Sequence, residues 1–256
     1  MLANFQWFIL NTINKYRTVP LGFGLFILAC LPVMCRGQLR ADTLREKRLF
    51  FPYPMTEKNW YSSLGLTLTK MPQEITEEVQ IRVPAIDFHV LRNLGRGFYL
   101  DGRINFELLQ NHLSIGPRYS QVINQQFSFS VGDDIAWWFG FLNISEFQTR
   151  ANGWLNYPNF SLGYRMHHHM LLTLKSEWML NLYYQSKVGS DVTSTSHRTY
   201  AGWTLGIYLE QPLYRKANFL LGLRAIHSNF FWETWSLFEP FEPTLFFPEI
   251  IIGIPL

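Results

Sequence analysis

Residues 127–142 alternate between two kinds of side chain with a period of two. Large apolar side chains occupy most odd positions, and small or polar ones occupy most even positions, as in the run Phe-Ser-Phe-Ser-Val-Gly that begins at Phe127. Successive side chains of a β-strand point to opposite faces. The run therefore predicts a long strand with one aromatic face and one small, polar face. Such a strand belongs in a sheet that separates two different environments.

The same alternation recurs along most of the chain. Ten segments show it, at residues 60–70, 77–90, 97–109, 112–121, 126–143, 154–166, 170–186, 199–211, 217–231 and 245–256. Aromatic residues make up 17% of the chain, whereas charged residues make up only 16%, against about 25% in a typical soluble domain. Mean hydropathy is nevertheless close to zero, as expected where apolar and polar faces cancel along each strand.

The first 37 residues have the three parts of a secretory signal. Lys15 and Arg17 precede an apolar run at 19–34, and the small residue Gly37 offers a cleavage point. We therefore predict a signal peptide at residues 1–37 that is cleaved after Gly37. A periplasmic extension at 38–59 and a barrel at 60–256 would follow it.

Removal of this leader changes the cysteine content and the charge. Cys30 and Cys35 both lie in it, which leaves a mature chain without disulfides. The leader also holds three basic residues and no acid, so the mature chain has 22 − 3 = 19 basic and 19 acidic residues. This neutral balance argues against nucleic acid as a partner.

The connections between the predicted strands also alternate. Those at 144–153, 187–198 and 232–244 are long, whereas those at 91–96, 122–125, 167–169 and 212–216 are mostly shorter. Long loops on one side and short turns on the other are typical of outer-membrane barrels. A soluble, lipocalin-like ligand-binding barrel would show the same alternation, with its apolar face inward. Small residues on the polar parity, and Trp and Tyr near segment ends, favour the membrane alternative.

The prediction is thus an all-β, antiparallel, up-and-down transmembrane β-barrel of about ten strands. Residues 60–256 resemble a small bacterial outer-membrane barrel, such as the OmpA transmembrane domain or OmpX, in architecture but not in any diagnostic motif. The resemblance implies a Gram-negative outer membrane, contact with its lipid, insertion by the barrel-assembly machinery, a monomer and no cofactor. It implies a non-enzymatic role, either structural with exposed surface loops or as a narrow, porin-like channel.

Charged residues recur on the polar parity, where they would face the lumen. Because buried charges persist only when they are paired, we predict an interior network of ion pairs. Pro84 is expected to introduce a bulge that changes the parity of its strand, and Asp133, on the apolar parity, suggests another irregularity. The predicted network comprises Arg82, Asp87, Asp101, Arg103, Glu107, Arg118, Asp134, Arg165, Lys175, Glu177, Glu210, Arg224 and Glu249.

Two histidine motifs give further hypotheses. His227-Ser228-Asn229 resembles the His-x-Ser-Asn motif of lipid A 3-O-deacylases, which implies an alternative function as an outer-membrane lipid hydrolase with Glu233 or Glu239 as the acid. The intervening residue is missing, so a bulge would be needed to bring His227 and Ser228 to one face. The run at 167–169 is His-His-His, but alternating directions and the lack of nearby ligands predict a polar turn and no metal.

Overall fold

The computed structural model describes residues 48–55, 59–72, 82–107, 110–144, 147–166, 170–195, 200–212, 218–228 and 244–256. They all belong to one compact unit that spans residues 44–256. The predicted leader lies outside the described residues, so it stays a prediction. No helix in the described ranges is long and apolar enough to cross a membrane.

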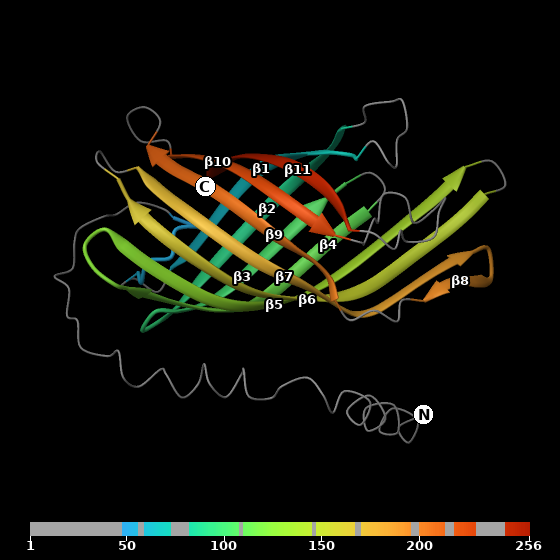
Figure 1. The fold of residues 1–256 in the computed structure, drawn as a ribbon, viewed down its shortest axis with the longest axis horizontal. Helices are drawn as coiled ribbons and strands as arrows, with labels where there is room; N and C mark the ends of the chain where they lie inside the picture. The colour runs from blue at the N-terminus through green and yellow to red at the C-terminus, as the bar shows by residue number, and fades with distance from the viewer. Residues whose placement is uncertain are drawn as a thin grey trace, which may run out of the picture. The chain divides into compact units, whose positions relative to one another are not determined.

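Ten strands close into an antiparallel barrel in the described part of the chain, which confirms the predicted fold class (Figure 1). Consecutive strands pair from β1 to β7, then β7 pairs with β9, and the ring closes where β11 pairs with β1. The short strand β8 pairs only with β7 and lies outside the ring. The strands are β1 (Trp60–Lys70), β2 (Arg82–Gly95), β3 (Phe98–Phe106), β4 (Gln110–Val122), β5 (Phe127–Ile144), β6 (Phe147–Arg165), β7 (Leu171–Val188), β8 (Asp191–Thr195), β9 (Tyr200–Pro212), β10 (Asn218–Ser228) and β11 (Leu245–Pro255).

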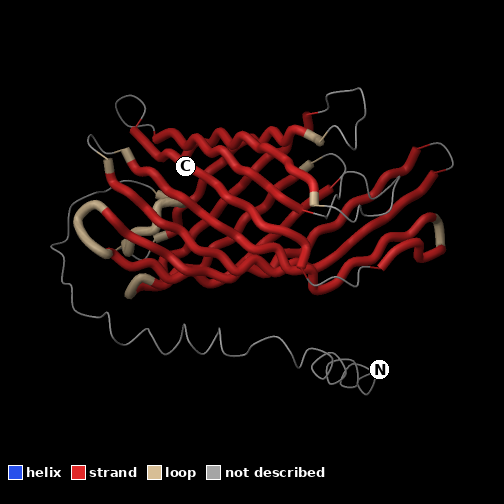
Figure 2. Tube along the Cα trace, in the orientation of Figure 1, coloured by secondary structure: helices blue, strands red, loops and turns tan. Residues whose placement is uncertain are grey.

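The two ends of the barrel differ in their connections. The end at which β1 begins and β11 finishes also holds the connections β2–β3, β4–β5, β6–β7 and β9–β10, and we call it the turn end. The opposite end, the loop end, holds the connection 229–244 and the projecting strand β8. Figure 2 shows the strands running between these ends, with the hairpins β5–β6 and β7–β8 extending furthest.

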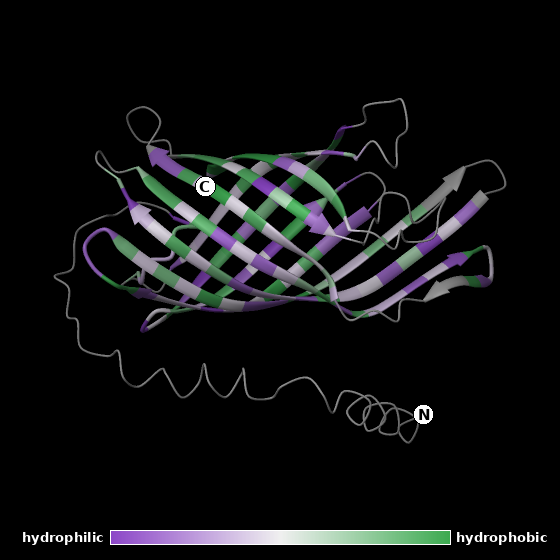
Figure 3. Cartoon of the chain, viewed as in Figure 1, coloured by the Kyte–Doolittle hydropathy of each residue, from purple (hydrophilic) through white to green (hydrophobic). Residues whose placement is uncertain are grey.

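The distribution of side chains is the reverse of that in a soluble protein, with apolar residues outside and polar residues inside. Apolar residues cover the outer face, as at Leu66, Ile86 and Ile252, which are neighbours in register and 61%, 49% and 48% exposed. Polar residues such as Ser130 and Thr173 are fully buried inside, and Figure 3 shows the alternation along the strands nearest the viewer. The lipocalin-like alternative, which places the apolar parity inward, is therefore wrong.

The predicted bulge at Pro84 is absent. Strands β1 and β2 keep one register from Trp60 opposite Arg92 to Lys70 opposite Arg82, with Pro84 opposite Leu68. Pro84 lies beyond the end of the β2–β3 ladder, which begins at Ile86. Because the parity never shifts, Arg82 shares the outward parity of Ile86 and is exposed. Its assignment to the lumen was wrong.

Three apolar clusters occupy the interior of the described barrel, and the smallest consists of Met71, Leu245 and Phe247. The turn-end cluster consists of Leu49, Phe50, Leu91, Tyr99, Tyr208, Leu220 and Ile251. The loop-end cluster consists of Ala136, Trp138, Ala151, Leu155, Met179, Tyr184 and Ala201. Most charged side chains of the interior lie between the turn-end and loop-end clusters and form the site described next.

Candidate functional site: a charged chamber in the lumen

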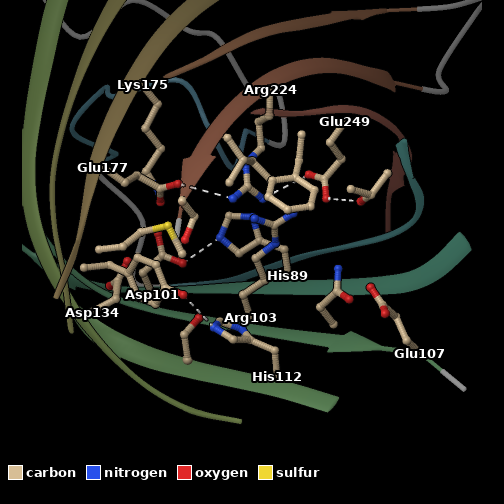
Figure 4. A pocket seen from close by; sticks show the side chains of 18 of the residues that line it. His89, Asp101, Arg103, Glu107, His112, Asp134, Lys175, Glu177, Arg224 and Glu249 are labelled. Carbon is tan, nitrogen blue, oxygen red and sulfur yellow. Dashed lines mark hydrogen bonds and ion pairs between the residues drawn. The ribbon is translucent and has the colours of Figure 1, made fainter. Parts of the chain in front are cut away.

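A cavity of about 120 Å³ lies inside the barrel among the charged side chains. We call it the chamber. Strands β1 to β7, β10 and β11 each contribute polar side chains to it, and Phe50 of the N-terminal segment lines it as well. Its main polar and charged lining residues, most of them labelled in Figure 4, are His89, Asp101, Arg103, Glu107, Gln110, His112, Asp134, Lys175, Glu177, Arg224 and Glu249.

Asp101 on β3 is held by two partners. One carboxylate oxygen lies 2.6 Å from Nε2 of His89 on β2, and the other accepts a 3.1 Å bond from Nη1 of Arg118 on β4. Beside them, Nε of Arg103 donates to Asp87 over 2.6 Å. These are cross-strand pairs on one face of the sheet, so they link β2, β3 and β4 as well as neutralise one another.

A second network crosses the other side of the chamber. Arg224 on β10 lies 3.0 Å from Glu249 on β11 and 3.7 Å from Glu177 on β7, as the dashed lines of Figure 4 show. Lys175 pairs with Glu177 over 2.8 Å. Thr204 also donates to Glu177 over 2.8 Å, and a threonine of β1 donates to Glu249. Both carboxylates therefore have hydrogen-bond donors in addition to a cationic partner.

The structure brings the predicted charged residues together, with the exception of Arg82. Most line the chamber, and Asp87 and Arg118 form ion pairs with residues that line it. Asp134 accepts a 3.0 Å bond from Asn159, and its second oxygen has no hydrogen-bond partner in the described structure. Arg165 and Glu210 lie at the turn end, where both contact the N-terminal segment.

That segment, residues 48–55, enters the lumen and closes the turn end; we call it the plug. Both oxygens of Glu210 accept backbone N–H bonds from the plug, at 2.8 Å from Leu49, 3.3 Å from Phe50 and 2.7 Å from Phe51. The Phe50 ring stacks on Tyr208 with the centroids 4.1 Å apart. These three plug residues are 0–3% exposed. Part of the predicted extension at 38–59 therefore lies inside the barrel, and its periplasmic location stays a prediction.

The far end of the plug is fixed by hydrogen bonds to β2 and β3. The Tyr99 hydroxyl donates to the carbonyl of Tyr53 over 2.9 Å and accepts the N–H of Met55. The side-chain amide of Asn93 donates to the Met55 carbonyl over 2.9 Å. Gly163 of β6 leaves space for the plug, since a Cβ there would lie 2.7 Å from the ring of Phe51. The wall is therefore shaped to receive this peptide.

Sequence reasoning missed the plug and several polar lining residues. The available signal was an aromatic cluster without strand alternation, Leu49-Phe50-Phe51, which is followed by Pro52-Tyr53-Pro54. His112 lies 3.3 Å from the Tyr157 hydroxyl on the chamber wall. The alternation does not distinguish such positions from other residues that face inward. Their contacts depend on side chains of other strands, which the alternation of one strand does not show.

His227 and Ser228 lie on opposite faces of β10. The His227 ring stacks on the outward Trp203, with the centroids 5.7 Å apart and the planes 3° apart. Ser228 is 1% exposed, and its hydroxyl donates to the Ala201 carbonyl over 2.9 Å. The register of β10 is unbroken against both neighbours, so no bulge brings the pair together. Glu233, Glu239 and Asn229 lie outside the described residues.

No group of three or more His, Cys, Asp or Glu side chains in the described ranges is arranged to hold a metal ion. The three histidines at 167–169 lie outside these ranges.

Comparisons with known proteins assign no family to this chain. No protein-family model matches the chain, and no curated protein matches it. Among solved structures, the chain is similar to the translocator domain of the autotransporter NalP from Neisseria meningitidis, with 9% identity and a TM-score of 0.42. That match covers 77% of this chain and 87% of the other.

Proposed function

We propose that this chain is an integral outer-membrane β-barrel protein with a structural, non-enzymatic role and a closed lumen. The observation that carries the proposal is the outer face. Large apolar side chains cover it strand after strand, and a monomeric soluble protein rarely exposes apolar patches beyond a few hundred Å². A lipid environment matches this face, because lipid requires an apolar exterior and a barrel without free edges.

The interior supports a barrel that does not conduct ions. The plug and the turn-end cluster fill one end of the lumen, and the loop-end cluster fills much of the other. Between them, the charged side chains are tied to one another by bonds of 2.6–3.1 Å, which leaves few charges for a permeating ion. The narrow-channel alternative would require the plug to leave.

The lipid-hydrolase alternative has less support. Its two residues, His227 and Ser228, face lipid and lumen respectively, so the imidazole is not placed to take the serine proton. In the proposed orientation the turn end faces the periplasm, and the projecting strands β5 to β8 stand on the cell surface. Outer-membrane lipid and the assembly machinery are then its partners, and the protein is a monomer.

Heat-modifiable mobility tests the proposal directly. The full chain is expressed in a Gram-negative host, and the outer-membrane fraction is run on a gel with and without boiling in detergent. We expect the protein in that fraction, with faster migration when it is not boiled. Recovery in the soluble fraction without detergent would contradict the proposal. In planar bilayers, we expect the purified protein to be electrically silent, whereas steady single-channel steps would restore the channel alternative.

A further inference from the structure

The chamber wall includes a small side chain on β4. Ser114 of β4 lines the cavity, and its cross-strand neighbour on β5 is Ala136. A volume of about 120 Å³ greatly exceeds the roughly 10–15 Å³ that one water molecule needs. The chamber therefore has room for a small organic molecule, and this holds whether or not the barrel sits in a membrane.

Several buried polar atoms in the chamber wall have no hydrogen-bond partner among the described residues. The acceptors are Oε1 of Gln110, a residue that is 4% exposed, and Oδ1 of Asp134. The donors are Nη2 of Arg103 and Nε of Arg224. A buried polar group without a partner is costly, so each of these atoms is a position where a ligand atom would be stabilised.

The nature of these atoms indicates the chemical class of the ligand. Arg103, Lys175 and Arg224 are each paired with a carboxylate, so these cations do not need an anionic ligand. The remaining atoms include both donors and acceptors, and a hydroxyl group can serve either kind. Phe50 and Phe247 add apolar ring surface to the lining. We propose that the chamber binds a small polyhydroxylated molecule of about monosaccharide size.

The chamber extends toward the loop end beside β3 and β4. Glu107 and Gln110 line the chamber and flank the β3–β4 connection at that end. Phe50 of the plug lines the chamber from the turn end, where the plug bonds to Glu210 hold it. The plug separates the chamber from the turn end, so a ligand would have to exchange through the loop end.

Isothermal titration calorimetry on the full, detergent-solubilised protein tests this site. The probes are D-glucose, D-ribose and myo-inositol, with L-alanine and putrescine as a zwitterion and a dication. We expect saturable binding of at least one polyhydroxylated probe. Ser114→Phe should abolish it by filling the chamber, and Gln110→Ala should weaken it about tenfold by removing a buried acceptor. Ser176→Phe places the same ring on the outer face of β7 and should leave binding unchanged.

Each other outcome overturns the proposal. Saturable binding of only L-alanine or putrescine would refute the polyhydroxylated class. Wild-type affinity in Ser114→Phe, with heat-modifiable mobility retained, would place any binding outside the chamber. If no probe saturates while the wild-type protein shows heat-modifiable mobility, the chamber holds only water and the inference fails, although the proposed membrane location would stand.

Discussion

The plug depends on a single carboxylate, and Glu210→Ala tests that dependence. Glu210 is 4% exposed and accepts three consecutive backbone N–H groups from the plug. Alanine removes every acceptor without adding bulk. The plug would then keep its ring stack on Tyr208 and its bonds to Tyr99 and Asn93, but Leu49 and Phe51 would lose the short bonds that hold their end in the lumen.

The magnitude follows from the two short bonds. At 2.8 Å and 2.7 Å they are charge-assisted, whereas the third, at 3.3 Å, is long and adds little. A hydrogen bond to a charged group contributes about 1.5–3 kcal/mol. Two at the lower figure give about 3 kcal/mol in favour of the seated plug. Their loss raises the population of the released plug by about a hundredfold.

Limited proteolysis reads out that population. The bond after Arg48 is a trypsin site, and Arg48 and Leu49 are 2% and 0% exposed while the plug is seated. When opening and closing are fast compared with cleavage, the cleavage rate follows the population of the open form. Mass spectrometry of the detergent-solubilised protein should therefore show cleavage after Arg48 about a hundredfold faster in Glu210→Ala than in wild type.

Two further variants separate plug release from general loosening. Glu107→Gln removes a lumen carboxylate at the loop end and should leave the cleavage rate after Arg48 unchanged. Gly163→Leu leaves Glu210 intact but adds a side chain whose Cβ alone would lie 2.7 Å from Phe51 and Pro52, so it should release the plug. If Glu210→Ala keeps the wild-type rate while the barrel stays folded, the carboxylate does not hold the plug and the reasoning fails.

Three other substitutions test the outer face, the lumen network and the hydrolase alternative. Leu66→Arg puts a charge between apolar register neighbours on the outer face and should cost about 2–4 kcal/mol in urea unfolding from lipid vesicles if lipid surrounds it; an unchanged midpoint would argue against lipid there. Arg224→Met leaves Glu177 and Glu249 without a shared cation and should cost up to about 3–5 kcal/mol, with part restored by adding Glu249→Gln. Ser228→Ala should leave lipid A acylation in the expression host identical to that produced by the wild-type chain, whereas acyl loss that depends on this serine would support the hydrolase.

Strands with uninterrupted alternation were predicted closely from the sequence. The first was expected at 60–70 and forms there, and the fifth was expected at 126–143 and spans Phe127–Ile144. The sixth was expected to begin at 154 but begins at Phe147. In that added part Gln148, Arg150 and Asn152 are exposed, so the apolar parity that marks a lipid-facing strand is absent.

The candidate site was less accessible to sequence reasoning. Alternation shows that Glu177 and Arg224 share the polar parity of their strands, but not that they lie close together on either side of β9. Their proximity depends on the register of β9 with β7 on one side and with β10 on the other. The plug was missed for a related reason, since its sequence carries no periodicity and its role depends on Glu210, 159–161 residues away.

Asp133 shows how register explains what one strand's sequence leaves irregular. The predicted irregularity does not occur on the β6 side, because β5 pairs with β6 without a shift from end to end, and Asp133 remains on the outer face. Its register neighbour on β6 is Pro158, and on β4 the ladder is interrupted at Gly116 and Pro117.

A proline has no N–H to give to a ladder, so polar backbone groups near Asp133 lose donors there. Asn156 supplies one, since its side-chain amide donates to the Asp133 carboxylate and lies 3.3 Å from the Asp134 carbonyl. The outward carboxylate of Asp133 thus helps to hold Asn156, whose amide replaces a missing backbone donor. The donor is missing because prolines on both neighbouring strands lie beside Asp133, and only the register of the sheet shows this.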